Sequence, residues 1–242
     1  MIGVLIPTQH KRDFFLEKSF EMLNRQTLQP DEVLVMDWEH KEETNVDLNW
    51  RYINGLIYLF NLGCECVALW EEDDYYSDDY LKNVITLYQQ LGKPNLFGIR
   101  NTIYYHLGLK RFALLRHQGH SSAMSMVLGR GIFNECVPNE WDVDFDYFLT
   151  RRIKNAIYVG LNDFTKNENV VNIGMKGISE SGTMGHKKES QIYHRNVKNS
   201  LYLSSVFDDK NLEFLKRHTG VFFEFYLSII NKINKHEAVS KL

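Results

Sequence analysis

The chain has 242 residues, of which 44% are hydrophobic and 24% are charged, and its formal net charge is −3. This composition supplies a sizeable apolar core and excludes both a disordered chain and a small disulfide-stapled protein. The net negative charge excludes a histone-like basic binder, although it is compatible with a local basic patch.

The cysteines and the N-terminus bear on the compartment. The chain holds 3 cysteines, and an odd number in a long chain favours reducing conditions, while one CxC pair without a second argues against zinc. A strand is predicted almost at Met1, which leaves no room for a signal peptide. Because no uncharged apolar run reaches about 18 residues, no membrane span is expected. We therefore expect a cytoplasmic protein.

The first hundred residues are predicted to alternate strand and helix. Short apolar runs predict strands at 4–6, 33–36 and 66–70. The run 33–36 is typical of a strand buried on both faces of a parallel sheet. Helical spacing predicts two intervening helices, with apolar faces formed by Leu16, Phe20 and Leu23, and by Ile53, Leu56, Ile57 and Phe60. The second helix ends at Gly63, a position where glycine is favoured. This βαβαβ order predicts an α/β sheet that binds ligands at the carboxyl ends of its strands.

The rest of the chain is predicted to be less regular. A helix at 79–91 carries apolar residues on one side, namely Leu81, Val84, Ile85 and Tyr88. The later elements are strands at 112–115 and 123–128, a helix at 144–154, strands near 157–159 and 170–173, a glycine-rich loop at 174–185, and helix from 208 to 242.

Four acidic residues follow the third predicted strand, in the segment 71–74 (EEDD). Like charges crowded together are costly unless a positive charge neutralises them. Mg²⁺ or Mn²⁺ prefers oxygen ligands and would also bridge a substrate diphosphate. The segment therefore predicts a metal site at the ligand-binding edge, and the alternative is a solvated acidic loop that caps the next helix.

An ordered series of motifs over residues 2–91 resembles the family-2 glycosyltransferases of the GT-A fold. The opening of that family is matched by 4–8 (VLIPT), Arg12, Leu16, Gln26-Thr27 and 30–37 (PDEVLVMD). A later helix motif is matched by Asn54-Gly55 and Gly63, and the metal segment by 71–81 (EEDDYYSDDYL). The resemblance implies a GT-A-like, Rossmann-related α/β fold, with a mostly parallel sheet flanked by helices and a C-terminal helical extension.

The resemblance also implies an activity and its donor site. It implies a metal-dependent glycosyltransferase that moves a sugar from a nucleotide-diphosphate donor, by family habit a UDP-sugar, to an acceptor hydroxyl. The implied donor-binding residues are Thr8, His10, Asp37, Arg51, Asn54 and Glu72. Asp73 and Asp74 would hold Mn²⁺ or Mg²⁺. Two departures from the family pattern, Glu71 for the first Asp of DxD and Trp38 after Asp37, bear on the identity of the donor.

The same resemblance extends to a base and a second metal ligand. The segment 146–152 (DYFLTRR) is similar to a family motif whose Asp is the catalytic base of inverting members, which implies that role for Asp146. Asp144 is the competing candidate, and acidic residues also suit a helix N-terminus without any catalytic role. GT-A enzymes often close a C-terminal loop over the donor, which implies a metal contact for His186, with His194 and Arg195 as alternatives.

Charge is distributed unevenly along the chain. Residues 80–134 contain 7 Lys or Arg and no Asp or Glu. Together with the ring of Tyr104, Arg111 and Arg116 mark a candidate acceptor surface. A glycan or glycolipid is the expected acceptor. A hydroxylated base of DNA is the alternative, because phosphates release counterions on basic surfaces. Alternatively, the basic residues only balance the negative charge of the acidic segment 71–74 and bind no acceptor.

We predict one catalytic domain at 1–206 and a C-terminal helical extension at 207–242. Residues 1–100 form the nucleotide-sugar-binding half of that domain and residues 101–206 its acceptor half. The apolar stretch 221–230 favours packing on the body or on a second subunit. A homo-oligomer that forms through this helix is therefore one of the alternatives. A nucleotidyltransferase is a further alternative, although the loop 7–12 lacks the glycines it would need. A degenerate, non-catalytic nucleotide-sugar binder is the last alternative.

Overall fold

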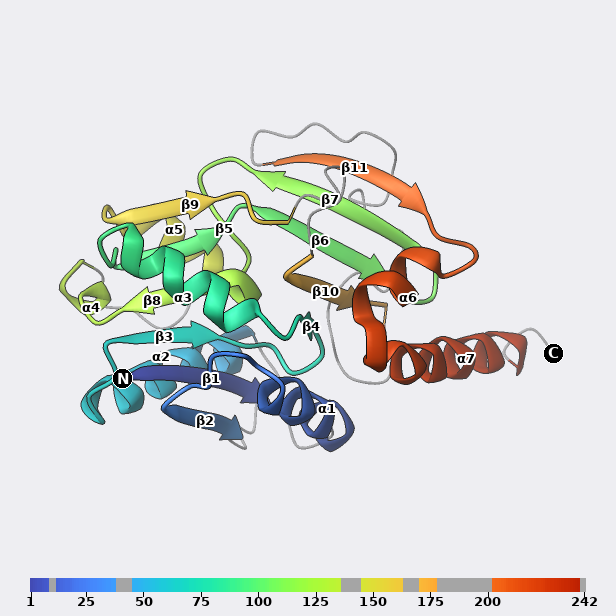
Figure 1. Cartoon of the computed structure of the whole chain (residues 1–242), viewed down its shortest axis with the longest axis horizontal. Helices are drawn as coiled ribbons and strands as arrows, with labels where there is room; N and C mark the ends of the chain where they lie inside the picture. Colours follow the sequence, from blue (N-terminus) through green and yellow to red (C-terminus); the bar gives the residue numbers. More distant parts are fainter. Residues whose placement is uncertain (9–11, 38–44, 136–144, 163–169, 178–201, 240–242) are drawn as a thin grey trace.

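The computed structural model describes residues 1–8, 12–37, 45–135, 145–162, 170–177 and 202–239, which form two sheets with flanking helices (Figure 1). The first sheet has the order β2-β1-β3-β8-β5-β9. Its strands are β1 (Ile2–Thr8), β2 (Glu32–Asp37), β3 (Cys66–Leu69), β5 (Leu96–Ile99), β8 (Met126–Gly129) and β9 (Ala156–Val159). β8 is antiparallel to both of its neighbours, and the other pairings are parallel. The sheet is therefore mostly parallel.

Helices cover both faces of the first sheet because its strands alternate their side chains between two cores. Val4 and Ile6 of β1 belong to the core on the side of α1 (Asp13–Asn24) and α3 (Tyr80–Gln90), whereas Leu5 belongs to the opposite core. That opposite core is completed by α2 (Asn45–Asn61), α4 (Ile132–Glu135) and α5 (Phe145–Arg152). The predicted α/β class, with a sheet flanked by helices and helices at the C-terminus, is confirmed.

The second sheet has the order β11-β7-β6-β10-β4. Its strands are β4 (Tyr75–Tyr76), β6 (Asn101–His106), β7 (Arg111–His117), β10 (Asn172–Lys176) and β11 (Tyr202–Asp208). α6 (Glu213–Thr219), η4 (Gly220–Phe222) and α7 (Phe223–Val239) pack against it, as Figure 1 shows at the C-terminal end of the chain. Phe112 stacks on Phe214 with ring centroids 3.8 Å apart, and Tyr105 donates a hydrogen bond of 2.9 Å to Asp209. The C-terminal helices thus share the core of the body.

Several local predictions are confirmed. All four apolar positions predicted for the helix near 79–91 are buried in α3. Gly63 follows α2 with φ of +102°, the left-handed conformation that favours glycine there. The short strand expected at 123–128 instead begins with a 3-10 turn, η1 (Ala123–Ser125), and continues as β8.

Three predictions of burial are wrong. The run 33–36 is not buried on both faces, because β2 is the edge strand and Val33 is 40% exposed. Phe20 and Ile57 were placed on apolar helix faces, yet they are 38% and 42% exposed. In α1 the buried face contains Ser19, whose hydroxyl accepts a hydrogen bond of 2.7 Å from the indole N–H of Trp70. Ser19 thus occupies a buried position of α1, and the next residue, Phe20, faces outward.

The C-terminal half also differs from expectation. The glycine-rich segment predicted as a loop from 174 begins inside β10, where a Cβ on Gly174 would collide with the ring of Tyr104. The strand β11 was not predicted, and it crosses the expected boundary between residues 206 and 207 while pairing with β7 as far as Asp208. The remainder of the loop lies outside the described residues.

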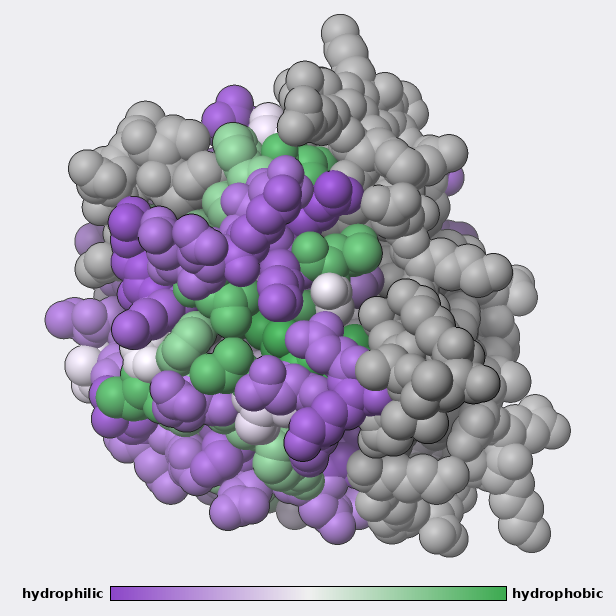
Figure 2. Space-filling view, turned by 90° about the vertical axis from the view of Figure 1, so that its right-hand side faces the viewer, coloured by the Kyte–Doolittle hydropathy of each residue, from purple (hydrophilic) through white to green (hydrophobic). Residues whose placement is uncertain are grey.

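The C-terminal helices leave some apolar surface uncovered. Val221 is 70% exposed and Phe14 is 42% exposed, and the ammonium of Lys232 lies 5.1 Å from the centroid of the Phe14 ring. Figure 2 shows this side of the molecule, with apolar residues gathered between polar ones. None of the helices described is long and apolar enough to span a bilayer. Association through this face stays a prediction.

Trp70 is the side chain that we expect to be most sensitive to truncation. It is fully buried, stacks on Tyr76 with ring centroids 3.8 Å apart, and lies between β3 and the acidic segment. Trp70→Ala should lower the free energy of unfolding by about 3–5 kcal/mol, measured by denaturant titration. Tyr58→Ala, at a side chain that is 53% exposed, is the control and should change it little. A loss below about 1 kcal/mol for Trp70→Ala would contradict this assignment.

Candidate functional site

The acidic segment forms a tight turn between the two sheets, which we call the acidic turn (residues 71–74). The backbone N–H of Asp74 donates to the carbonyl of Glu71 at 3.3 Å, and the N–H of Glu71 donates to the hydroxyl of Tyr76 at 2.9 Å. The chain then continues into β4, which pairs with β10 of the second sheet. The turn is therefore held at the carboxyl end of β3 and against the second sheet, the edge where open α/β sheets bind ligands.

The carboxylates of this turn converge. Oxygen atoms of Glu71, Asp73 and Asp74 all lie within 4.8 Å of one another. Asp73 and Asp74 are 5% and 0% exposed, and the Oδ2 atom of Asp74 is buried without a hydrogen-bond partner. A buried carboxylate oxygen without a donor is costly, and a cation would satisfy it. This donor set of hard oxygens fits Mg²⁺ or Mn²⁺.

Two arginines approach the turn from the first sheet. Nη1 of Arg12, at the start of α1, lies 2.5 Å from Oε1 of Glu72 and 3.7 Å from Oδ2 of Asp73. Arg51 of α2 is buried and donates a hydrogen bond to the carbonyl of Thr8 at the end of β1. Burial and the neighbouring charge of Asp73 raise the pKa of Glu72 to about 7, although Arg12 opposes that rise.

A lysine approaches the turn from the second sheet. Nζ of Lys176, at the end of β10, lies 3.7 Å from Oδ1 of Asp74 and 5.2 Å from the centroid of the Tyr104 ring. The hydroxyl of Tyr104 forms a 2.6 Å hydrogen bond with that of Ser122. Burial alone would lower the pKa of Lys176. The negative charges of Asp74 and the other carboxylates raise it by more, so the pKa is raised overall. The ammonium is therefore charged at neutral pH.

Asp146 lies near the same turn. It is in the first turn of α5, next to Phe145, whose ring stacks on Tyr52 with centroids 4.6 Å apart. The hydroxyl of Tyr52 in turn donates to Glu71 at 3.1 Å. Burial raises the pKa of Tyr52, and the charges of Glu71 and Asp146 raise it further, as they do for Tyr104. The charges of Glu71 and Asp146 thus act on the same two tyrosines, and the stack of Phe145 on Tyr52 connects the first turn of α5 to the acidic turn.

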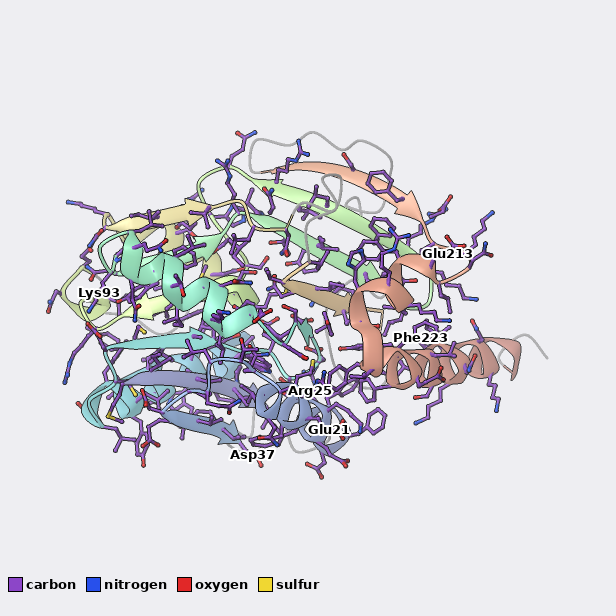
Figure 3. The ribbon with its side chains drawn as sticks, in the orientation of Figure 1. Glu21, Arg25, Asp37, Lys93, Glu213 and Phe223 are labelled. Carbon is purple, nitrogen blue, oxygen red and sulfur yellow. The ribbon has the colours of Figure 1, made fainter. Side chains whose placement is uncertain are left out.

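The other predicted donor-binding residues are only partly brought together. Thr8 is buried beside Arg51, while Asp37 is exposed at the end of β2, where Figure 3 labels it. The side-chain amide of Asn54 donates to the carbonyl of Trp50 on its own helix at 2.9 Å. The predictions for His10 and His186, and the alternatives Asp144, His194 and Arg195, lie outside the described residues.

The candidate acceptor residues do not share one surface. In the β6–β7 pairing, Tyr104 lies opposite Ala113 and His106 opposite Arg111, so Tyr104 and Arg111 are on one face of the second sheet. Side chains alternate along a strand, so Arg116 belongs to the other face, where it is exposed. Arg111 also pairs with Asp208, its Nε lying 2.7 Å from a carboxylate oxygen. Arg111 and Arg116 therefore do not form one continuous basic surface on this sheet.

No protein-family model matches the chain, and no curated protein matches it. Among solved structures, the chain is similar to S. aureus TarS 1-349 in complex with UDP-GlcNAc, with 12% identity and a TM-score of 0.47 over 74% of this chain and 60% of that one. It is also similar to a glycosyltransferase involved in the glycosylation of the major capsid of PBCV-1, with 14% identity and a TM-score of 0.44 over 74% of this chain and 94% of that one. These values are low, so the inference of function rests on the residues of the site.

Three contributors to the site were not predicted as site residues. Lys176, Tyr52 and the hydroxyl of Ser122 reach the acidic turn or its neighbours only through the tertiary fold. Tyr52 is adjacent in sequence to Arg51, a predicted donor-binding residue, and this was the one indication in the sequence that Tyr52 lies near the site. Lys176 stood in a segment expected to be a loop, and nothing in its local sequence marked it.

Proposed function

We propose that this protein is a metal-dependent glycosyltransferase that moves a sugar from a nucleotide-diphosphate donor to a hydroxyl of a glycan or glycolipid. The observation that carries the proposal is a buried carboxylate cluster with an unsatisfied oxygen on Asp74, connected through Tyr52 and Phe145 to the first turn of α5, which carries Asp146. One carboxylate group suited to a metal and a separate carboxylate suited to a base are what direct displacement from a diphosphate requires. By the habit of the family that the motif series resembles, the donor that we propose is a UDP-sugar.

Each residue has a defined role in the proposed reaction. Glu71, Asp73 and Asp74 would hold Mn²⁺ or Mg²⁺. The bound cation would supply positive charge against the departing diphosphate. Arg12 and Arg51 add positive charge at the ends of β1 and β3, on the donor side of the turn. These side chains together stabilise a leaving group that accumulates negative charge.

Asp146 takes the proton in this mechanism. The acceptor oxygen forms a bond to the anomeric carbon while the bond from that carbon to the diphosphate oxygen breaks, and the hydroxyl proton passes to the Asp146 carboxylate. A single displacement inverts the configuration of the sugar, so we propose an inverting enzyme. The reaction needs no covalent enzyme intermediate.

The proposal is tested by incubating the full chain with a panel of nucleotide sugars and Mn²⁺ while released nucleotide is measured. We expect one nucleotide diphosphate to be released, and we expect chelation of the metal to stop its release. Release of pyrophosphate from nucleoside triphosphates with sugar phosphates would instead indicate a nucleotidyltransferase. Tight binding of a nucleotide sugar without any release, even with candidate glycan acceptors, would indicate a non-catalytic binder.

The acceptor is tested in the same assay with glycans and with duplex DNA that carries hydroxylated bases. We favour a glycan, because Arg111 pairs with Asp208 and Arg116 belongs to the other face of the sheet. Labelled sugar should therefore appear on a glycan or glycolipid. Transfer to DNA, together with DNA binding that weakens as salt rises, would overturn this choice of acceptor.

A further inference from the structure

A buried ion pair connects the acidic turn to the second sheet. Asp74 is fully buried, and the side chain of Lys176 is 13% exposed, with 3.7 Å between Oδ1 and Nζ. The backbone N–H of Met175, the preceding residue, donates to the same Oδ1 atom at 2.7 Å. One oxygen of Asp74 is thus committed to β10, and the other is buried without a hydrogen-bond partner.

The backbone around Lys176 is fixed. β10 pairs with β6 through Lys176 itself, opposite His106. The next residue, Gly177, has φ of +82°, and a Cβ at that position would collide with the imidazole of His106. The strand therefore brings Lys176 to the turn, where its ammonium lies 5.2 Å from the centroid of the Tyr104 ring and 3.7 Å from the Asp74 carboxylate.

The charges around the cluster follow from these contacts. Four carboxylates occupy the acidic turn, and the described cations within 4.0 Å of them are Arg12, which approaches Glu72 and Asp73, and Lys176, which approaches Asp74. The chain thus neutralises part of its own acidic site before any ligand binds. A divalent cation placed on the free oxygen of Asp74 would be a close neighbour of the Lys176 ammonium, and like charges at such separations repel.

We propose that Lys176 is a built-in cation of the acidic turn, which weakens the binding of a free divalent cation so that tight binding requires the diphosphate of the donor. This inference rests on the proposed function. A diphosphate brings negative charge that both the ammonium and the divalent cation can contact, so their repulsion is offset only when the donor is present. Lys176 is then a positioning residue, which makes binding of the cation and of the donor interdependent.

The experiment measures binding of Mn²⁺ to the full chain by calorimetry, with and without UDP, in the absence of any sugar donor. In the wild type, UDP should tighten Mn²⁺ binding at least tenfold. Lys176→Met and Lys176→Gln should bind Mn²⁺ alone at least tenfold more tightly than the wild type, and UDP should enhance it less. Lys82→Gln is the matched control and should behave as the wild type. It removes the same charge from a lysine that is 62% exposed and whose ion pair with Asp79 is long, at 4.0 Å.

Stability is checked in parallel, because Lys176→Met leaves Asp74 buried without its counter-ion. Lys176→Gln keeps a polar side chain without the charge, and Lys176→Arg keeps the charge and should keep the Mn²⁺ affinity of the wild type. If neither neutral variant folds, the wild type still tests the inference. Mn²⁺ binding that is equally tight with and without UDP would overturn it.

Equal or weaker Mn²⁺ affinity in the neutral variants would also overturn the inference, because Lys176 would then only support the fold. The proposed function fails separately. If the wild type releases nucleotide from a donor while the variants bind Mn²⁺ unchanged, only the inference falls. If no donor is turned over but the neutral variants bind Mn²⁺ more tightly, the role of Lys176 at the cation site stands and the glycosyltransferase assignment falls.

Discussion

Asp146→Asn should lower turnover by about a hundredfold or more while leaving the affinity for the donor nearly unchanged. A general base contributes on this scale because it removes the acceptor proton as the new bond forms, and an amide cannot accept that proton. The substitution preserves the shape of the side chain. The backbone carbonyl of Asp146, which accepts a 2.6 Å hydrogen bond from the Thr150 hydroxyl, is not altered. Helix α5 should therefore stay folded.

The measurement is kcat with saturating donor and acceptor, together with the dissociation constant of the nucleotide. Asp144→Asn is the matched control, because it removes the same charge two positions earlier, and we expect it to be mild. If Asp144→Asn produces the large loss and Asp146→Asn the small one, the base is Asp144. Two mild variants would argue against a mechanism that uses a carboxylate base from this segment.

Local sequence pattern predicts well those elements in which a single apolar face determines which residues are buried. In α3 the apolar residues recur with helical spacing against a single core, and each of the four predicted positions is buried. The prediction for β2 was wrong because an apolar run does not reveal how many neighbours a strand has. Phe20 is exposed, whereas its neighbour Ser19 is buried and accepts a hydrogen bond from a residue 51 positions away. Neither the position of β2 at the edge of the sheet nor the hydrogen bond of Ser19 can be inferred from the local sequence.

The candidate site divides in the same way. The carboxylates of the acidic turn are consecutive, so the sequence alone brings them together at the end of a predicted strand. Lys176 and Tyr104 reach that turn through the register of β10 with β6, a parallel pairing between segments about seventy residues apart. Such a register depends on tertiary packing, and the segment around Lys176 carries glycines that pointed to a loop. The positive side of the site was therefore the harder half to predict.

Asp73→Asn should abolish both turnover and the Mn²⁺-dependent part of nucleotide binding while the protein remains folded. Asp73 is buried within the cluster of ligand oxygens, and an amide binds a divalent cation much more weakly than a carboxylate does. Removing one of several crowded negative charges should leave the stability of the metal-free protein unchanged or raise it, because Arg12 keeps its 2.5 Å contact with Glu72.

The measurement for Asp73→Asn is calorimetric titration of UDP with and without Mn²⁺, followed by thermal unfolding of the metal-free protein. Asp78→Asn is the control, since Asp78 lies at the surface in an ion pair of 2.6 Å with Arg25, and exposed pairs contribute little. It should keep the full effect of Mn²⁺ on UDP binding. An unchanged Mn²⁺–UDP affinity in Asp73→Asn would show that the cation is not held by the acidic turn. A large loss of stability would instead show that Asp73 holds the turn together through Arg12.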